Sequence, residues 1–351
     1  MFMRSTAAWP AAWPAAWPAA WPAAWPAASP AASPARRRVL FVGGSLDQTT
    51  IVHKIASELA EAECVFTPYY ADGLLHWAAE RGLLDFTTLG GRPKAASEAF
   101  LRERGATLDP RGSSGGFDLV VTTSDLVVPR NLHGVPIVLV QEGMTDPEDW
   151  RYGLVRRLKL PRYLASTSMT GLSHAYAAFC VASEGYRELF ARKGVAPDKL
   201  EVTGIPNFDD CESFLSNDFP LHGYVLATTS CLRETLRPED RRGFIRSALE
   251  VADGRTLFFK LHPNEDHVRA RREIEALACH SIVFDSGNTN HMIANCDALV
   301  TRYSSAVYVA VALGKEVHAD IEPVTLRRLA PIQNGGTSAR RIANVCRRFL
   351  S

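Results

Sequence analysis

The sequence predicts an α/β fold made of two Rossmann-like domains that face each other across a cleft. Short apolar runs recur along the chain, and glycine or polar turns and helical patterns follow them. The series stops at a polar segment that is bounded by prolines, and then it starts again. The 351 residues leave enough chain for two such domains, each with its own core.

The first domain is predicted over residues 36–207. Residues 39–42 form an apolar run that ends in Gly44 and Ser45, and a helical pattern follows through Ile51 and Ile55. This order of strand, glycine turn and helix is typical of the first unit of a doubly wound sheet. Continuous apolar runs predict the further strands, as in parallel sheets that are covered on both faces. These strands are residues 64–66, 119–122, 137–140, 179–181 and 200–203.

A polar stretch, residues 206–222, separates this series from a second one and contains the predicted linker, residues 208–219. The second domain is predicted over residues 220–351, with a helix around 244–251 and a terminal helix around 340–350 that we expect to pack back on the first domain. Its predicted strands are residues 224–227, 256–261, 281–284, 298–301 and 316–318.

Residues 1–35 hold a repeat with a period of four, Ala-Ala-Trp-Pro and then Ala-Ala-Ser-Pro. A proline at every fourth position blocks a helix, so we expect this low-complexity tail to be disordered or polyproline-like. Two interpretations stay open: a peptide that binds a partner or a membrane surface, and a repeat without a function of its own.

Composition excludes several classes of protein. A formal net charge of +1 does not indicate binding to nucleic acid. The seven cysteines have no Cys-x-x-Cys spacing, so we expect reduced thiols in the cytoplasm and no zinc site. No apolar run approaches the roughly 20 residues that span a bilayer. Peripheral association with a membrane stays open.

Two groups of polar residues follow predicted strands and are candidates for chemistry. Glu142 comes directly after the strand 137–140, where a carboxylate facing a cleft is well placed as a general base; the alternative is a solvated loop residue. Ser230 and Arg233 follow the first strand of the second domain and are candidates for binding a phosphate; the alternative is a loop that caps the next helix.

Two further groups lie in the second domain. His262 and Pro263 follow the strand 256–261, and a histidine there can donate a proton or a hydrogen bond to a phosphate. Ser304 and Ser305 open a helical stretch, where hydroxyl and N–H groups can bind an anion. The alternative is that the histidine and the serines only brace and cap their loops.

A His-Pro pair followed by a Ser-Ser helix start in the second of two such domains resembles the GT-B superfamily of nucleotide-sugar enzymes. It is similar to bacterial sialyltransferases, Kdo-transferases and CDP-glycerol glycerophosphotransferases. Gln141-Glu142-Gly143 resembles their acidic-acidic-glycine motif, with Gln141 in place of one acid. The resemblance implies Glu142 as the base for the acceptor hydroxyl, and His262 with the two serines as the groups that hold the donor phosphate.

The layout of residues 39–350 also resembles the non-hydrolysing UDP-N-acetylglucosamine 2-epimerases. Their Gly-Thr-Arg-Pro-Glu turn corresponds to residues 44–48, which begin with Gly44 and Ser45 but lack the arginine. Their Gly-His-Arg-Arg-Glu motif corresponds to residues 230–234, which lack the histidine. The paired glutamates near position 309 are also replaced. The resemblance implies that Gly44, Ser45, Ser230 and Arg233 lie near the donor nucleotide.

We therefore expect a glycosyltransferase-like enzyme that moves a sugar or polyol phosphate from a nucleotide-linked donor to a glycan or lipid-linked acceptor. No Asp-x-Asp pair is present, so we expect no metal and no cofactor other than the donor itself. The first alternative is a UDP-N-acetylglucosamine 2-epimerase-like protein, either active or reduced to nucleotide binding. The second is a protein that acts through its Trp-Pro tail.

Overall fold

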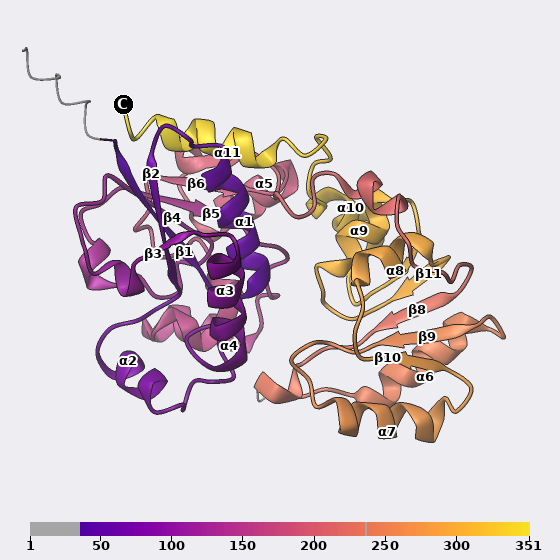
Figure 1. Ribbon diagram of the computed structural model, residues 1–351. Coiled ribbons are helices and arrows are strands. Elements are labelled where there is room, and N and C mark those ends of the chain that lie inside the picture. The colour runs from indigo at the N-terminus through magenta and orange to yellow at the C-terminus, as the bar shows by residue number, and fades with distance from the viewer. Residues whose placement is uncertain (1–35, 236) are drawn as a thin grey trace, which may run out of the picture. The chain divides into compact units, whose positions relative to one another are not determined.

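The computed structural model describes residues 36–235 and 237–351, and Arg36–Ser351 form one compact unit (Figure 1). The expectation for residues 1–35 lies outside the described residues. Within the described part, no helix is both long and apolar enough to cross a bilayer.

The first sheet is parallel and has seven strands in the order β3-β2-β1-β4-β5-β6-β7. The order reverses between β1 and β4, which is the switch point where doubly wound sheets bind ligands. The strands are β1 Arg38–Gly43, β2 Glu63–Pro68, β3 Thr107–Leu108, β4 Leu119–Thr122, β5 Ile137–Val140, β6 Ala178–Val181 and β7 Leu200–Val202.

Helices flank this sheet because its central strands are buried on both faces. Val39, Leu40 and Phe41 have no exposed surface, and Leu40 pairs with Val65 on one side and Val120 on the other. The α-helices of this part are α1 Leu46–Ser57, α2 Gly73–Glu80, α3 Gly91–Glu103, α4 Trp150–Leu158 and α5 Glu184–Lys193.

The second sheet is also parallel, with five strands in the order β10-β9-β8-β11-β12 and a switch point between β8 and β11. Its strands are β8 Val225–Thr228, β9 Leu257–Lys260, β10 Ile282–Phe284, β11 Ala298–Val300 and β12 Glu316–His318. Its helices are α6 Arg241–Ala252, α7 His267–Leu277, α8 Thr289–Asn295 and α9 Ala306–Ala312. Two parallel sheets with flanking helices confirm the predicted fold class.

The chain returns to the first sheet after β12. Helix α10, Pro323–Leu329, lies against α5, where the Ser183 hydroxyl donates to the Leu329 carbonyl at 3.1 Å. Helix α11, Ser338–Arg347, packs against α1, and Arg347 pairs with Glu61 at 2.7 Å (Figure 1). The terminal helix thus contacts the first Rossmann-like domain.

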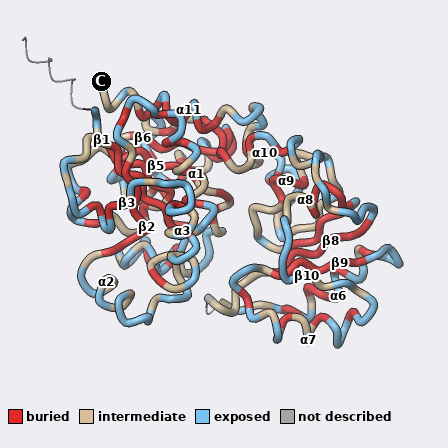
Figure 2. The backbone as a smooth tube through the Cα atoms, viewed as in Figure 1, coloured by how far each residue is buried: buried red, intermediate tan, exposed pale blue. Residues whose placement is uncertain are grey.

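The buried residues follow the two sheets (Figure 2). One cluster surrounds the first sheet and extends to residues of α8, α9 and α11. A separate cluster joins the second sheet to helices α6 and α7, and its members include Phe244, Ile245, Phe259 and Ile274. The polar segment 206–222 carries only a short 3-10 helix, Cys211–Leu215.

Candidate functional site

The predicted site residues follow the carboxyl ends of β1, β5, β8 and β9, or lie at the turn after β11. Because all strands of each sheet are parallel, the loops of one sheet leave from the same edge. Contacts between the loops then decide which of these residues work together.

Glu142 lies at the end of β5 and is held by a residue of α1. Its Oε2 atom accepts a hydrogen bond from the side-chain amide of Gln48. Gln48 is buried, and Glu142 is mostly buried with a small part of its surface open to solvent. The first domain therefore presents a positioned carboxylate at the carboxyl edge of its sheet.

Gln48 is fixed in turn by the start of α1. The Ser45 hydroxyl accepts the Gln48 backbone N–H, and the Gln48 Oε1 atom accepts the Ser45 backbone N–H at 2.9 Å, which together form a capping box. A Cβ atom at Gly44 would lie 1.6 Å from Gln48 Oε1, so a larger residue there would push the Gln48 amide out of this position. Gly44 and Ser45 thus position Gln48, which in turn donates to Glu142.

The surroundings of Glu142 raise its pKa to about 7. Burial is the main cause, because it disfavours the charged form, and the negative charges of Asp47 and Asp146 add to it. The hydrogen bond from Gln48 opposes the rise. A carboxyl group with a near-neutral pKa can both take up and release a proton at physiological pH.

The Glu142 loop contacts the second domain at Ser305. The Met144 N–H donates to the Ser305 hydroxyl oxygen at 2.9 Å. A Cβ atom at Gly143 would lie 2.5 Å from the same oxygen, so the glycine permits this approach. The hydroxyl proton of Ser305 keeps its capacity to donate to a ligand.

The same loop also contacts the segment that follows β8. Asp146 accepts a hydrogen bond from Arg237 at 2.9 Å and one from the Thr167 hydroxyl. Burial alone raises the pKa of Asp146, but Arg237 and Thr167 outweigh it and lower the pKa. Asp146 is therefore held ionised beside Glu142. It has an arginine partner, whereas Glu142 has a neutral one.

His262 follows β9, and its ring is oriented by its own turn. The Nδ1 atom accepts the Asn264 backbone N–H at 3.1 Å, which places the proton of the neutral ring on Nε2. The Nε2 atom lies 3.8 Å from the sulfur of Cys231. Burial and the Lys260 ammonium lower the pKa of His262, although Glu234 opposes them. The neutral ring thus offers one N–H group as a hydrogen-bond donor.

A buried carboxylate, Glu265, ties the His262 turn to the loop after β8. Glu265 accepts hydrogen bonds from the His262 backbone N–H at 2.8 Å and from the Thr229 hydroxyl. It also forms an ion pair with Arg241 at 2.7 Å. Arg241 also pairs with buried Glu239 at 3.2 Å. This ionic cluster fixes the two loops relative to each other.

Ser230 and Arg233 are engaged by carboxylates. The Ser230 hydroxyl donates to Glu239 at 2.7 Å. The guanidinium of Arg233 makes two hydrogen bonds with Glu273, at 2.7 and 2.8 Å. Their predicted role in binding the donor phosphate stays a prediction, because in this structure both hold the loop to its own domain.

Two predicted site residues remain to be placed, Ser304 and Pro263. The Ser304 hydroxyl accepts the Ala306 N–H at 3.3 Å, just before α9, whose N-cap residue is Ser305. Pro263 is exposed in the turn after His262. The Glu142 loop is thus bonded to Ser305. It is also bonded to Arg237, whose backbone N–H donates to the Leu232 carbonyl in the loop after β8. The same loop carries Cys231, which lies beside His262.

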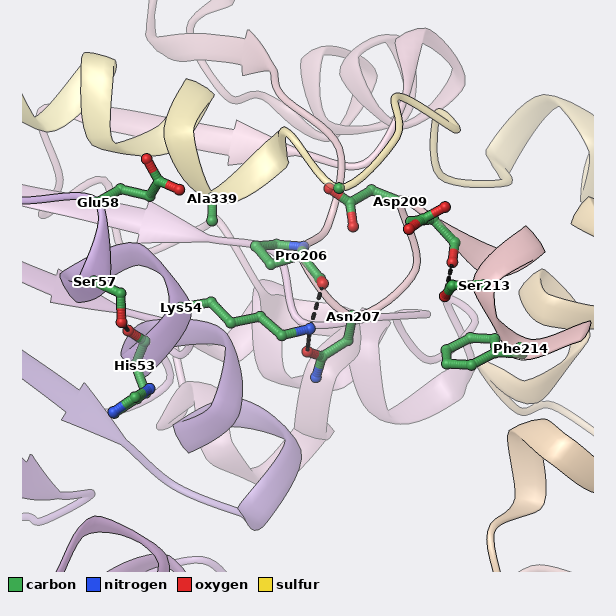
Figure 3. Close-up of a pocket in the computed structure, with 12 residues that line it drawn as sticks. His53, Lys54, Ser57, Glu58, Pro206, Asn207, Asp209, Ser213, Phe214 and Ala339 are labelled. Atoms are coloured by element: carbon green, nitrogen blue, oxygen red, sulfur yellow. Dashed lines mark hydrogen bonds between the residues drawn. The ribbon is translucent and has the colours of Figure 1, made fainter. Parts of the chain in front are cut away.

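A pocket of about 420 Å³ lies elsewhere, between α1, residues 206–214 and the start of α11 (Figure 3). Lys54 reaches across it and donates to the Pro206 carbonyl at 2.7 Å and to Asn207 Oδ1 at 3.0 Å. None of the predicted site residues lines it. In the described part of the chain, no cluster of three or more histidine, cysteine or acidic side chains is arranged to hold a metal ion.

Comparison with known proteins supports the fold. No protein-family model matches the sequence, and no curated protein matches it. Among solved structures, UDP-GlcNAc 2-epimerase from Neisseria meningitidis has a TM-score of 0.55 at 13% identity, over 89% of this chain and 100% of that one. A putative UDP-N-acetylglucosamine 2-epimerase from Listeria monocytogenes has a TM-score of 0.54 at 13% identity, over 90% and 97%.

The wall teichoic acid polymerase TagF has a TM-score of 0.48 at 10% identity, over 90% of this chain and 88% of that one. The two epimerase matches place the chain in the GT-B fold class, as the sequence predicted. At 13% identity these matches show the fold and do not show the activity.

Sequence reasoning did not find Gln48, Glu265, Arg237 and Arg241. Gln48 carried a signal, since it lies three residues after Ser45 in the pattern of a capping box. The others carried none, because their partners are far away in the chain or lie in another loop.

Proposed function

We propose that the protein transfers a sugar or a polyol phosphate from a nucleotide-activated donor to a hydroxyl group of a glycan or lipid-linked acceptor. The observation that carries this proposal is Glu142, a carboxyl group with a pKa of about 7 whose loop contacts Ser305 of the second domain. Such a group can remove the acceptor proton as the hydroxyl attacks, while the bond between the transferred group and the nucleotide breaks and the nucleotide leaves with its phosphate.

The donor phosphate would lie against the second domain. The Nε2–H of His262 and the hydroxyls of Ser304 and Ser305 supply hydrogen bonds to it. Because the His262 pKa is lowered, the ring acts as a neutral donor of a hydrogen bond and not as an acid. A structural neighbour that was solved bound to UDP-GlcNAc supports a nucleotide-linked ligand.

Nucleotide binding is the first test. UDP, CMP and CDP are titrated against the full chain, and thermal unfolding is followed. At a ligand concentration of 100 times Kd, a ligand that binds only the folded state stabilises it by about 2.7 kcal/mol. Ser304→Ala with Ser305→Ala should reduce this shift, whereas Ser281→Ala, whose hydroxyl donates to the Ala278 carbonyl, should leave it unchanged. A chain that none of the nucleotides stabilises contradicts the proposal.

Metal dependence is the second test. Hydrogen bonds take the place of a cation in the proposed site, so EDTA should leave turnover unchanged. Activity that EDTA abolishes and manganese or magnesium restores would contradict this part of the proposal.

The second candidate is an epimerase-like activity, which the fold match to two 2-epimerases favours. It predicts that UDP-N-acetylglucosamine alone is converted to its C2 epimer. The transferase proposal predicts no conversion without an acceptor. Product analysis with and without an acceptor distinguishes the two.

A further inference from the structure

Gln141, the residue before Glu142, is buried, with 1% of its surface exposed. Its side-chain amide bridges two backbone groups. The Nε2 atom donates to the Gly143 carbonyl at 2.8 Å, and the Oε1 atom accepts the Ala182 N–H at 2.9 Å. The amide therefore closes the turn that carries Glu142 and joins this turn to the residue that follows β6.

These two partners require an amide side chain. The Gly143 carbonyl can only accept a hydrogen bond and the Ala182 N–H can only donate one, so the side chain between them must offer a donor and an acceptor at once. An ionised carboxylate offers acceptors alone. This requirement gives a physical reason for the glutamine that stands in place of one acid in Gln141-Glu142-Gly143.

The groups that bond to the Gln141 side chain are neutral in the part of the chain that the structure describes. Besides the two peptide groups, the amide contacts the hydroxyl of Tyr186, which is buried on α5. Burial raises the pKa of Tyr186, although its hydrogen bonds with Tyr308, Thr145 and Gln141 oppose the rise. The phenol therefore stays neutral, and a charged side chain at position 141 would have no ionic partner among these groups.

The backbone is thereby fixed on both sides of Glu142. The Gln141 N–H donates to the Cys180 carbonyl at 2.9 Å, next to the pairing of β5 with β6, and the Gly143 carbonyl is held by the Gln141 amide. The carboxylate of Glu142 accepts from Gln48 on α1. Gln141 thus sets where the backbone of Glu142 lies, and Gln48 orients its carboxylate.

We propose that Gln141 is a positioning residue, whose amide holds the Glu142 turn so that the carboxylate reaches both Gln48 and the acceptor hydroxyl. The inference rests on the proposed function for the acceptor, and on the geometry of the turn for the rest. Without the amide, the buried Gly143 carbonyl and Ala182 N–H lose their partners, and the turn rearranges to regain them. A displacement of about 1 Å in a reacting group can lower turnover about 100-fold.

The test compares Gln141→Met with the wild type. Methionine is similar in length and neutral, so it removes both hydrogen bonds without adding a charge. Per folded molecule, kcat should fall about 100-fold while Kd for the nucleotide donor stays unchanged, because the turn lies on the acceptor side. Gln333→Met is the matched control and should change neither value. Gln333 also bridges two backbone groups, the Cys211 N–H and the Phe208 carbonyl, and lies between α10 and α11.

A second readout does not require turnover. The titration of the Glu142 carboxyl carbon is followed by NMR, and its signal is assigned by its loss in Glu142→Gln. In Gln141→Met the midpoint should fall from about 7 towards the ordinary value of 4.5, because a displaced carboxyl group is less buried. The charged groups that face Glu142 are Asp47 from α1 and Asp146 from its own loop, and both are present in each variant.

A folded Gln141→Met with wild-type kcat, or with a midpoint that does not fall, would overturn the inference and leave Gln141 a purely structural role. An equal loss of kcat in Gln333→Met would overturn it as well. If the wild type transfers no group, the proposed function fails and the midpoint alone decides the inference. If Gln141→Met does not fold, Gln141→Asn takes its place, since its amide is one methylene shorter and cannot reach Gly143 and Ala182 at once.

Discussion

At the scale of residues, two neighbouring carboxylates have different partners and therefore different pKa values. Asp146 has Arg237 as its partner and stays ionised, whereas Glu142 has the neutral amide of Gln48 and its pKa rises to about 7. Two titratable groups whose environments separate their pKa values are typical of acid–base sites.

The raised pKa of Glu142 links stability to pH. The folded state binds the Glu142 proton more tightly than the unfolded chain does. The contribution of Glu142 to the free energy of unfolding is therefore fully present below pH 4.5 and is lost as the pH rises through about 7. Above pH 7, Glu142→Gln removes a buried charge and should raise the free energy of unfolding by about 1 to 3 kcal/mol. Urea denaturation at pH 5 and pH 8 measures the difference.

The exposed Glu148→Gln on the same loop is the control and should change little at either pH. If Glu142→Gln were to destabilise the protein at pH 8, the role of Glu142 would be structural and its assignment as a base with a raised pKa would fail.

Glu142 could be predicted from the sequence, because it directly follows a recognisable strand. Its partner Gln48 could not. The Ser45–Gln48 spacing predicts a cap for the helix, but nothing in the chain says which side chain lies across from the amide.

At the scale of elements, the central strands were predicted to within one or two residues at their ends, because parallel strands buried on both faces are continuously apolar. The predictions 119–122, 137–140 and 316–318 coincide with β4, β5 and β12. Strand β3, Thr107–Leu108, was missed because its two residues carry no periodic signal.

The ionic cluster below the β8 and β9 loops could not be predicted either. Glu265 comes three residues after His262 in a polar turn, where a carboxylate is normally solvated. The structure buries it with Arg241 instead.

Glu265→Gln should therefore remove one of the two carboxylate partners of Arg241, with Glu239 as the other, and lower the free energy of unfolding by about 1 to 3 kcal/mol. Glu275→Gln, an exposed position on α7, should change it by less than about 0.5 kcal/mol. Chemical denaturation at pH 7 compares the two. Equal stability of both variants would show that the cluster does not hold the loops.

At the scale of the whole molecule, the two Rossmann-like domains follow from the restart of the strand pattern after residues 206–222. Their contact at Gly143 and Ser305 could not be predicted in this way, because it depends on how the two domains pack together. A glycine at position 143 indicates a close approach only once Ser305 is known to lie beside it.

Gly143→Ala should bring a methyl group against the Ser305 hydroxyl and lower the free energy of unfolding by about 1 to 3 kcal/mol. In a Ser305→Ala background the loss should be smaller, and the double-mutant cycle gives the coupling. Gly153→Ala, in α4 with open space around it, is the control. Additive effects of Gly143→Ala and Ser305→Ala would contradict the contact.

The most direct measurement is turnover and donor affinity of Glu142→Gln with the nucleotide donor that the binding screen identifies. Because the acceptor proton is removed only in the transition state, kcat should fall about 100- to 10,000-fold while Kd for the donor stays unchanged. In the wild type, kcat should rise with pH through about 7, as the carboxyl group ionises. A variant with full turnover, or one whose loss lies entirely in donor affinity, would contradict Glu142 as the base.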